Sequence, residues 1–216
     1  MTTLPTAGST WSCTERKGSM RPLVSLICLL SGAVSPAASQ WFMGVELATT
    51  RYRGSAHDTS VSHVASEGRP GGGASVSLRL DKRWNRWGSA LRISYANTGF
   101  AVAGSGVNLT DKTTGRLLEL SMLVNTRVGG IGPSGAVRVE LGPALHLWDF
   151  DGEFRLRAGA LGGVAYEWSV TNRLLGSVRL EGMLSPSWFN ADDVPPEFER
   201  RATWRYGVGL GLSYRL

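Results

Sequence analysis

The chain has 216 residues, of which 42% are hydrophobic and 9% aromatic, a size and composition that suit one domain. No apolar run approaches the ~20 residues that a membrane-spanning helix needs. Both cysteines, Cys13 and Cys28, precede residue 40, which excludes disulfides, zinc–thiolate sites and cysteine nucleophiles from residues 40–216. Residues 1–39 hold three basic residues and one acidic residue, and the 20 basic and 16 acidic residues that remain are too nearly balanced to indicate nucleic-acid binding.

Residues 1–39 are expected to be an N-terminal extension and a secretory signal peptide. Arg21 precedes the apolar run of residues 23–34, and the small residues Ser-Pro-Ala-Ala-Ser at 35–39 provide a cleavage site. Translation is expected to start at Met20, because residues 1–19 show no such pattern. A lipid attachment signal would need a small residue before Cys28, where Ile27 stands. The predicted mature domain is therefore residues 40–216, without a lipid anchor.

Residues 40–216 alternate apolar and polar side chains with the two-residue period of β-strands. Every odd position from Trp41 to Leu47 is apolar, and the same alternation runs from Trp204 to Leu216. The intervening segments with this pattern are residues 76–84, 87–95, 118–125, 137–147, 155–168 and 174–184. The sequence predicts an all-β chain of eight antiparallel strands, an even number that suits an up-and-down barrel.

Alternation alone leaves open which face points into the barrel, because a soluble lipocalin-like carrier also alternates, with its apolar side chains inside. The polar face combines charges with small residues such as Gly207, Gly209 and Gly211, as a narrow eight-stranded interior requires. Aromatic residues at the ends of the apolar stripes are expected to form the two interfacial girdles of a membrane barrel, namely Trp41, Trp84, Trp87, Tyr95, Trp168, Trp188, Trp204 and Tyr214. The apolar face is therefore expected to point outward.

The last strand ends with Tyr214 third from the C-terminus and Leu216 at the end. This resembles the signal by which the barrel assembly machinery recognises outer-membrane barrels, with Leu216 where an aromatic residue is usual. Residues 40–216 resemble the small eight-stranded barrels of the OmpA transmembrane domain and OmpX type. The resemblance implies a transmembrane barrel in the bacterial outer membrane, in contact with its lipid and lipopolysaccharide and with the assembly machinery. We expect a monomer without a cofactor.

The loop lengths agree with this orientation. Residues 85–86, 128–135 and 169–172 form short connections that are expected to face the periplasm, whereas residues 53–73, 99–115 and 189–203 are longer and are expected outside the cell. The remaining outer connection, around Asp151 and Gly152, is short. The long loops are the expected place for contacts with an extracellular ligand.

Charged residues of the polar face are expected to pair inside the barrel, because unpaired buried charges would be costly. The expected ion-pair network comprises Glu46, Arg79, Asp81, Arg92, Glu119, Arg138, Glu140, Arg155, Arg157, Glu167, Arg179, Glu181, Arg205 and Arg215. His146 is an expected further member. A closed structural lumen is the main interpretation, and a narrow or gated channel is the alternative.

A second group of basic residues falls in or beside the outer loops. Guanidinium groups bind phosphates bidentately, and lipopolysaccharide carries phosphates at this height of the membrane. The possible lipopolysaccharide contacts are Arg51, Arg53, Arg69, Lys112, Arg116, Arg200 and Arg201.

Some barrels similar to these are lipid A deacylases or acyltransferases, whose chemistry needs a nucleophile, a base and an orienting acid. His57, Asp58, Ser60 and His63 lie together in the first long loop and could supply such a site or bind a metal. The His-x-Ser arrangement on a strand that would resemble the deacylases is missing. We therefore expect a non-enzymatic barrel with a structural or surface-interaction role, with a lipid A modifying enzyme as the alternative.

Overall fold

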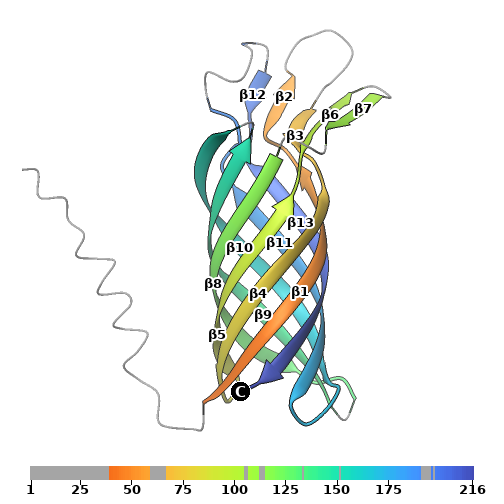
Figure 1. The fold of residues 1–216 in the computed structure, drawn as a ribbon, viewed down its shortest axis with the longest axis vertical. Coiled ribbons are helices and arrows are strands. Elements are labelled where there is room, and N and C mark those ends of the chain that lie inside the picture. Colours follow the sequence, from red (N-terminus) through yellow and green to blue (C-terminus); the bar gives the residue numbers. More distant parts are fainter. Residues whose placement is uncertain are drawn as a thin grey trace, which may run out of the picture. The chain divides into compact units, whose positions relative to one another are not determined.

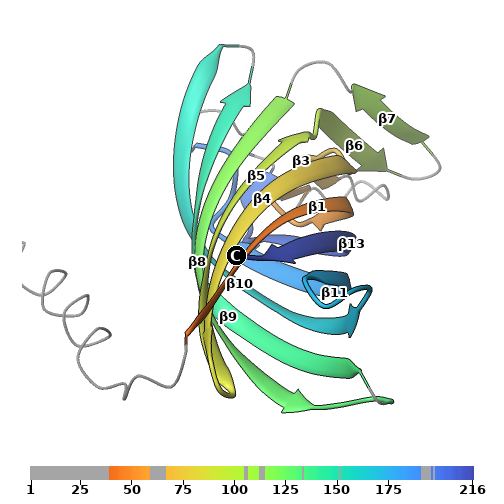
Figure 2. The ribbon, with the colours of Figure 1, turned by 60° about the horizontal axis from the view of Figure 1, so that its bottom comes forward.

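Eight long antiparallel strands close into a barrel and run obliquely to its axis (Figures 1 and 2). Their order around the barrel is β1-β13-β11-β10-β9-β8-β5-β4, and β13 and β4 both pair with β1. The strands are β1 (Gln40–Arg53), β4 (Gly73–Trp84), β5 (Trp87–Asn97), β8 (Gly115–Gly129), β9 (Gly135–Phe150), β10 (Glu153–Ser169), β11 (Leu174–Ser185) and β13 (Thr203–Arg215). The predicted eight-stranded up-and-down barrel is confirmed.

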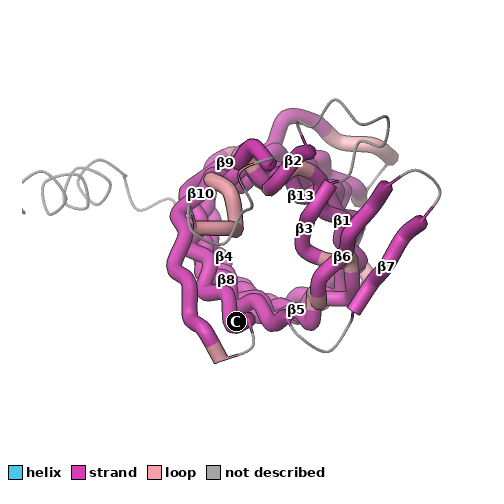
Figure 3. The backbone as a smooth tube through the Cα atoms, turned by 90° about the horizontal axis from the view of Figure 1, so that it is seen from above, coloured by secondary structure: helices cyan, strands magenta, loops and turns pink. Residues whose placement is uncertain are grey.

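The computed structural model describes residues 39–58, 67–104, 107–111, 115–132, 134–150, 152–190, 196 and 198–216. Residues 1–38 of the expected leader lie outside this range. In the described part of the chain, no helix is long and apolar enough to cross a membrane. Viewed along the barrel axis, the strands form a closed ring (Figure 3).

A second sheet lies at one end of the barrel, which we call the outer end (Figure 1). Its strand order is β12-β2-β3-β6-β7, and we call it the outer sheet. The strands are β2 (Ala56–Asp58), β3 (Glu67–Pro70), β6 (Phe100–Gly104), β7 (Val107–Asp111) and β12 (Phe198–Arg200). Only loops were predicted here, because strands of three to five residues are too short for a two-residue period to stand out.

The opposite, inner end carries the short connections. Asn85 occupies the left-handed region (φ 54°) in the two-residue turn between β4 and β5, a conformation that asparagine tolerates. The other inner connections, at residues 130–134 and 170–173, are also short. The predicted division into short inner turns and long outer loops is confirmed.

Apolar side chains cover the outside of the barrel. Leu47 of β1 is 64% exposed, and its neighbours in register, Val76 of β4 and Leu210 of β13, are also exposed. Such a continuous apolar surface would be unfavourable in water and is suited to lipid. The inside-out arrangement is therefore confirmed, and the soluble carrier is excluded.

Small residues make room inside the barrel for larger charged ones. A Cβ atom added at Gly209 would lie 2.9 Å from a carboxylate oxygen of Glu46 and 3.2 Å from the Cβ of Ala48. Gly209 therefore leaves the space that the Glu46 side chain occupies. This is the packing that an eight-stranded interior requires.

Candidate functional site

Charged side chains from all eight barrel strands meet in the interior. Among the described residues, six guanidinium groups and six carboxylates form one connected set of ion pairs, which we call the lumen network. Its members are Glu46, Arg79, Asp81, Arg83, Arg92, Glu119, Arg138, Glu140, Glu167, Arg179, Glu181 and Arg205. Equal numbers of the two charges make the network formally neutral.

The inner half of the lumen network centres on Glu167 of β10. Arg83 donates to both Glu167 oxygens at 2.8 and 2.9 Å, and Arg138 donates to the same carboxylate at 3.0 Å. Arg138 also donates to the side-chain oxygen of Asn125 at 3.1 Å, and Asn125 donates to Asp81 at 3.4 Å. The resulting arrangement crosslinks four strands near the inner turns.

The outer half is organised around two carboxylates that share two arginines. Arg92 donates to Glu181 and Glu119, the latter at 2.8 Å. Arg205 binds the same carboxylates, at 3.2 Å to Glu181 and 2.6 Å to Glu119. The Nε2 atom of His146 lies 3.1 Å from Glu119. This buried carboxylate therefore has three partners, Arg92, Arg205 and His146.

Arg179 and Arg79 join the two halves. Arg179 binds Glu46 at 2.9 Å and also pairs with Glu140. Arg79 binds Glu140 and Asp81, each at 2.8 Å. The ion pairs therefore form a continuous chain of contacts along the lumen.

An aromatic cluster, which we call the aromatic cap, lies beyond the lumen network toward the outer end. The rings of Tyr52 and Trp148 are 5.8 Å apart, those of Trp148 and Trp188 are 5.6 Å apart, and Phe150 meets Trp188 edge-on at 4.8 Å. Phe100 and Phe189 complete the cap. Tyr52, Trp148 and Trp188 are at most 1% exposed, so the cap covers the charged interior with an apolar layer.

Three arginines predicted for the network lie near the ends of their strands. Arg157 lies at the outer end of β10 and donates to the backbone oxygen of Ser187 at 3.1 Å and the side chain of Asn190 at 2.6 Å. Arg155 is buried near the same end and binds Glu153 of its own strand at 2.6 Å. Arg215 is exposed at the end of β13. The predicted role was wrong for Arg157 and Arg215, because the alternation continues beyond the section of the barrel where the carboxylates lie.

Arg83 and Asn125 were not predicted as members of the network. Arg83 follows Asp81 by two residues on the same strand, so the two-residue period itself indicated it. Asn125 was placed on the polar face but was not assigned to the network, because its role depends on the cross-strand contacts to Arg138 and Asp81. Only the three-dimensional arrangement reveals those contacts.

Seven of the predicted girdle residues face the exterior near the ends of the barrel. Trp41, Trp87, Tyr95, Trp204 and Tyr214 are between 41% and 56% exposed, while Trp84 and Trp168 are partly buried. Trp188 was predicted wrongly, since it is only 1% exposed and belongs to the aromatic cap. Strand β11 ends at Ser185, and the chain beyond it turns inward, so strand alternation no longer applies.

The predicted lipopolysaccharide contacts do not form one group. Arg51, Arg53 and Arg116 are exposed on the outer wall of the barrel. Arg69 is partly buried and donates to the backbone oxygen of Tyr52 at 2.8 Å. Arg200 and Arg201 are exposed in the outer sheet and beside it, whereas Lys112 lies outside the described residues.

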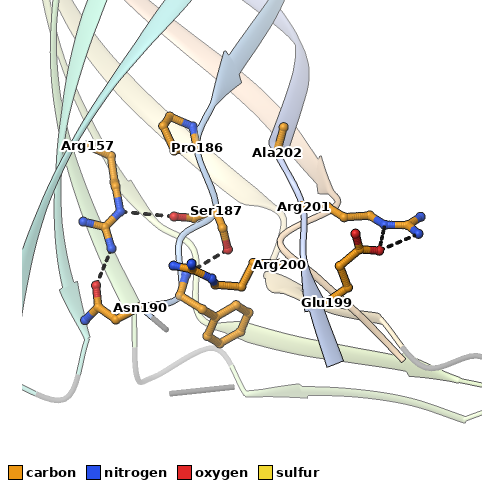
Figure 4. A pocket seen from close by; sticks show the side chains of 9 residues that line it. Arg157, Pro186, Ser187, Asn190, Glu199, Arg200, Arg201 and Ala202 are labelled. Atoms are coloured by element: carbon orange, nitrogen blue, oxygen red, sulfur yellow. Dashed lines mark hydrogen bonds and ion pairs between the residues drawn. The ribbon is translucent and has the colours of Figure 1, made fainter. Parts of the chain in front are cut away.

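A hollow of about 790 Å³ lies between the end of β10, the segment after β11 and strand β12 (Figure 4). Phe189 and Pro186 give it an apolar part. Arg201 is paired with Glu199 at 3.1 Å, while Arg157 holds the segment after β11 by the contacts given above. The residues lining the hollow are Arg157, Pro186, Ser187, Phe189, Asn190, Glu199, Arg200, Arg201 and Ala202.

The catalytic candidates are only partly described. His57 lies in β2, where its backbone neighbours are Glu67 on one side and Glu199 on the other. Ser60, His63 and the Asp58 side chain lie outside the described residues. Within the described part of the chain, no cluster of three or more metal-binding side chains is found.

No protein-family model and no curated relative matches the sequence. Among solved structures, Neisserial surface protein A (NspA) is similar to 82% of this chain over 97% of its own length, with a TM-score of 0.56 and 9% identity. Ail of Yersinia pestis (TM-score 0.42, 12% identity, 82% and 99% covered) and the outer membrane protease OmpT of Escherichia coli (0.43, 7%, 86% and 99%) also match. At these identities the likeness concerns the fold alone.

The fold, the apolar exterior and the charged interior together define the class. The protein is an integral membrane β-barrel with the fold of the small eight-stranded outer-membrane barrels.

Proposed function

We propose that the protein acts through its outer end, as a non-enzymatic surface-interaction protein of the outer membrane. The observation that carries this proposal is the contrast between the two parts of the molecule. The lumen is filled by a neutral ion-pair network beneath an aromatic cap, whereas three of the outer connections build an additional sheet. Loops with a purely connecting role have no need of such order.

The outer sheet and the neighbouring hollow supply the surface for such contacts. β7 pairs only with β6, and β12 pairs only with β2, so each end of the sheet has one strand edge without a partner in the described part of the chain. The hollow adds arginines and the apolar side chains of Phe189 and Pro186. These features support recognition of an extracellular macromolecule.

The proposal is tested by bacterial adhesion to surfaces coated with extracellular-matrix protein. We expect adhesion to fall when residues 102–110 are replaced by a two-residue turn, which shortens the outer sheet. A matched control replaces residues 130–134 at the inner end in the same way. Both variants must show the heat-dependent electrophoretic mobility of a folded barrel, and unchanged adhesion with the shortened outer sheet would contradict the proposal.

Two further measurements separate the alternatives. A sealed lumen predicts no current steps in a planar bilayer, so regular steps would favour a channel. A lipid A modifying enzyme would change the mass of lipid A in cells that produce the protein, and His57→Ala would abolish the change. We expect neither effect.

A further inference from the structure

We infer that Arg51 and Arg53 bind the phosphates of a lipid A molecule of the outer leaflet, at the seam between β1 and β13. Both side chains occupy outward-facing positions of β1, next in the alternation after Thr49, and both are exposed. Side chains two residues apart on a strand lie on one face, ~7 Å from each other. The two guanidinium groups can therefore reach neighbouring phosphate oxygens of one headgroup.

The neighbouring strand β13 contributes aromatic side chains. Tyr206 is directly opposite Arg51 and Trp204 is directly opposite Arg53, and these rings are 43% and 56% exposed. The guanidinium carbon of Arg53 lies 5.9 Å from the centre of the Tyr206 ring. The aromatic surface and the cationic groups are thus combined at one place on the exterior.

In the described part of the chain, two glycines border the opposite flank of the arginines. On this side β1 is followed by β4, where Thr50 is in register with Gly73. A Cβ atom added at Gly72 would lie only 3.6 Å from the Cγ atom of Arg51. Because Gly72 and Gly73 have no side chains, nothing from them covers Arg51, and a bulky headgroup can approach.

The height of these residues matches the phosphate layer. Tyr214, at the inner end of β13, is ten residues from Trp204, which corresponds to ~33 Å of strand and, at a tilt of about 40°, to ~25 Å of height. This equals the usual height of the apolar band, so Trp204 and Arg53 lie at its outer boundary. Between Trp204 and Tyr214, the exposed side chains of Val208, Leu210 and Leu212 form the apolar surface of β13.

Arg51 and Arg53 supply the positive charge that an anionic ligand needs. In the described part of the chain, neither of them forms an ion pair with a carboxylate, in contrast to Arg201 with Glu199. Guanidinium groups bind phosphate by two parallel hydrogen bonds, and such bonds are strong at the edge of a membrane, where water is scarce. The exposed Arg116 on β8, by contrast, has no second arginine two residues further along its strand.

The inference rests on the outer-membrane location and on the outward direction of the long loops, and it is independent of what the outer sheet binds. The test is native mass spectrometry of the detergent-purified barrel with bisphosphorylated lipid A. Arg51→Gln combined with Arg53→Gln is expected to weaken binding at least about tenfold, consistent with the loss of two charge-assisted contacts. The control combines Arg86→Gln with Arg127→Gln, which removes two exposed arginines from the inner end and is expected to leave binding unchanged.

Further measurements identify the ligand group. Dephosphorylated lipid A should bind the wild type as weakly as bisphosphorylated lipid A binds the double variant, and Arg51→Lys with Arg53→Lys should retain part of the affinity. Equal loss in the double variant and the inner-end control, or equal binding of phosphorylated and dephosphorylated lipid A, would overturn the site. Equal binding of phosphatidylglycerol would overturn the assignment to lipid A. Because this assay uses purified protein, its result is separate from that of the adhesion assay.

Discussion

Arg79 of β4 and Glu140 of β9 form an ion pair of 2.8 Å across the lumen, between strands that β5 and β8 separate around the barrel. The same carboxylate also binds Arg179 of β11. Glu140 therefore holds three strands together through its two oxygens. Such contacts oppose the flattening and opening of a narrow barrel.

Glu140→Gln should destabilise the barrel by about 3–5 kcal/mol, because it leaves two buried arginines without their shared negative charge. The measurement is the urea midpoint for loss of the folded electrophoretic band in lipid vesicles. Glu199→Gln provides the control, since Glu199 pairs with Arg201 on the surface, where an ion pair contributes only about 0–1 kcal/mol. Equal effects of the two substitutions would argue against a stabilising lumen network.

Gly209→Ala should destabilise the barrel by about 1–3 kcal/mol, because the added methyl group would collide with the Glu46 carboxylate and overpack the interior. The matched control is Gly182→Ala on the exterior, where a Cβ atom would approach no heavy atom closer than 3.9 Å. Urea titrations of both variants give the comparison. The space-filling argument fails if the two alanines have the same effect.

Trp188→Ala should cost about 3–5 kcal/mol, since it removes the central ring of the aromatic cap. Trp87→Ala, at a position that is 55% exposed, should cost less. We expect no conductance from either variant, because the lumen network below the cap is unchanged. Current steps with Trp188→Ala would show instead that the cap is what closes the lumen.

Arg157→Ala should make the segment after β11 sensitive to protease while the barrel keeps its stability. Arg157 is the side chain that joins β10 to Ser187 and Asn190, and its loss leaves that segment without these anchors. Limited proteolysis of folded protein in vesicles, followed by mass spectrometry, locates the cleavage. Arg116→Ala, an exposed arginine on β8, should leave the cleavage pattern of the wild type, and a resistant Arg157→Ala variant would refute the anchoring role.

Strand alternation predicted the barrel well because one face of each long strand contacts lipid and the other contacts the interior. It placed Glu46, Glu119 and Arg205 inside without any knowledge of their partners. The partners themselves depend on the stagger between strands, which brings Arg79 to Glu140 from distant parts of the sequence. That relationship leaves no local pattern.

The outer end was harder to predict. Trp188 follows Pro186 at a point where β11 has ended, so its inward position follows from tertiary packing against Trp148 and Phe150. The outer sheet is likewise assembled from short strands in three different connections. Local sequence carries little information about either feature.

The distribution of charges over the strands has a consequence for assembly. Arg205 of β13 supplies a positive partner to both Glu119 and Glu181, and Glu46 of β1 supplies the negative partner of Arg179. A sheet lacking the first or last strand would keep uncompensated charges on its concave side, which a hydrocarbon environment penalises strongly. Joining β1 to β13 thus completes the neutralisation of the interior, so this distribution of charges favours insertion into the membrane together with closure of the ring.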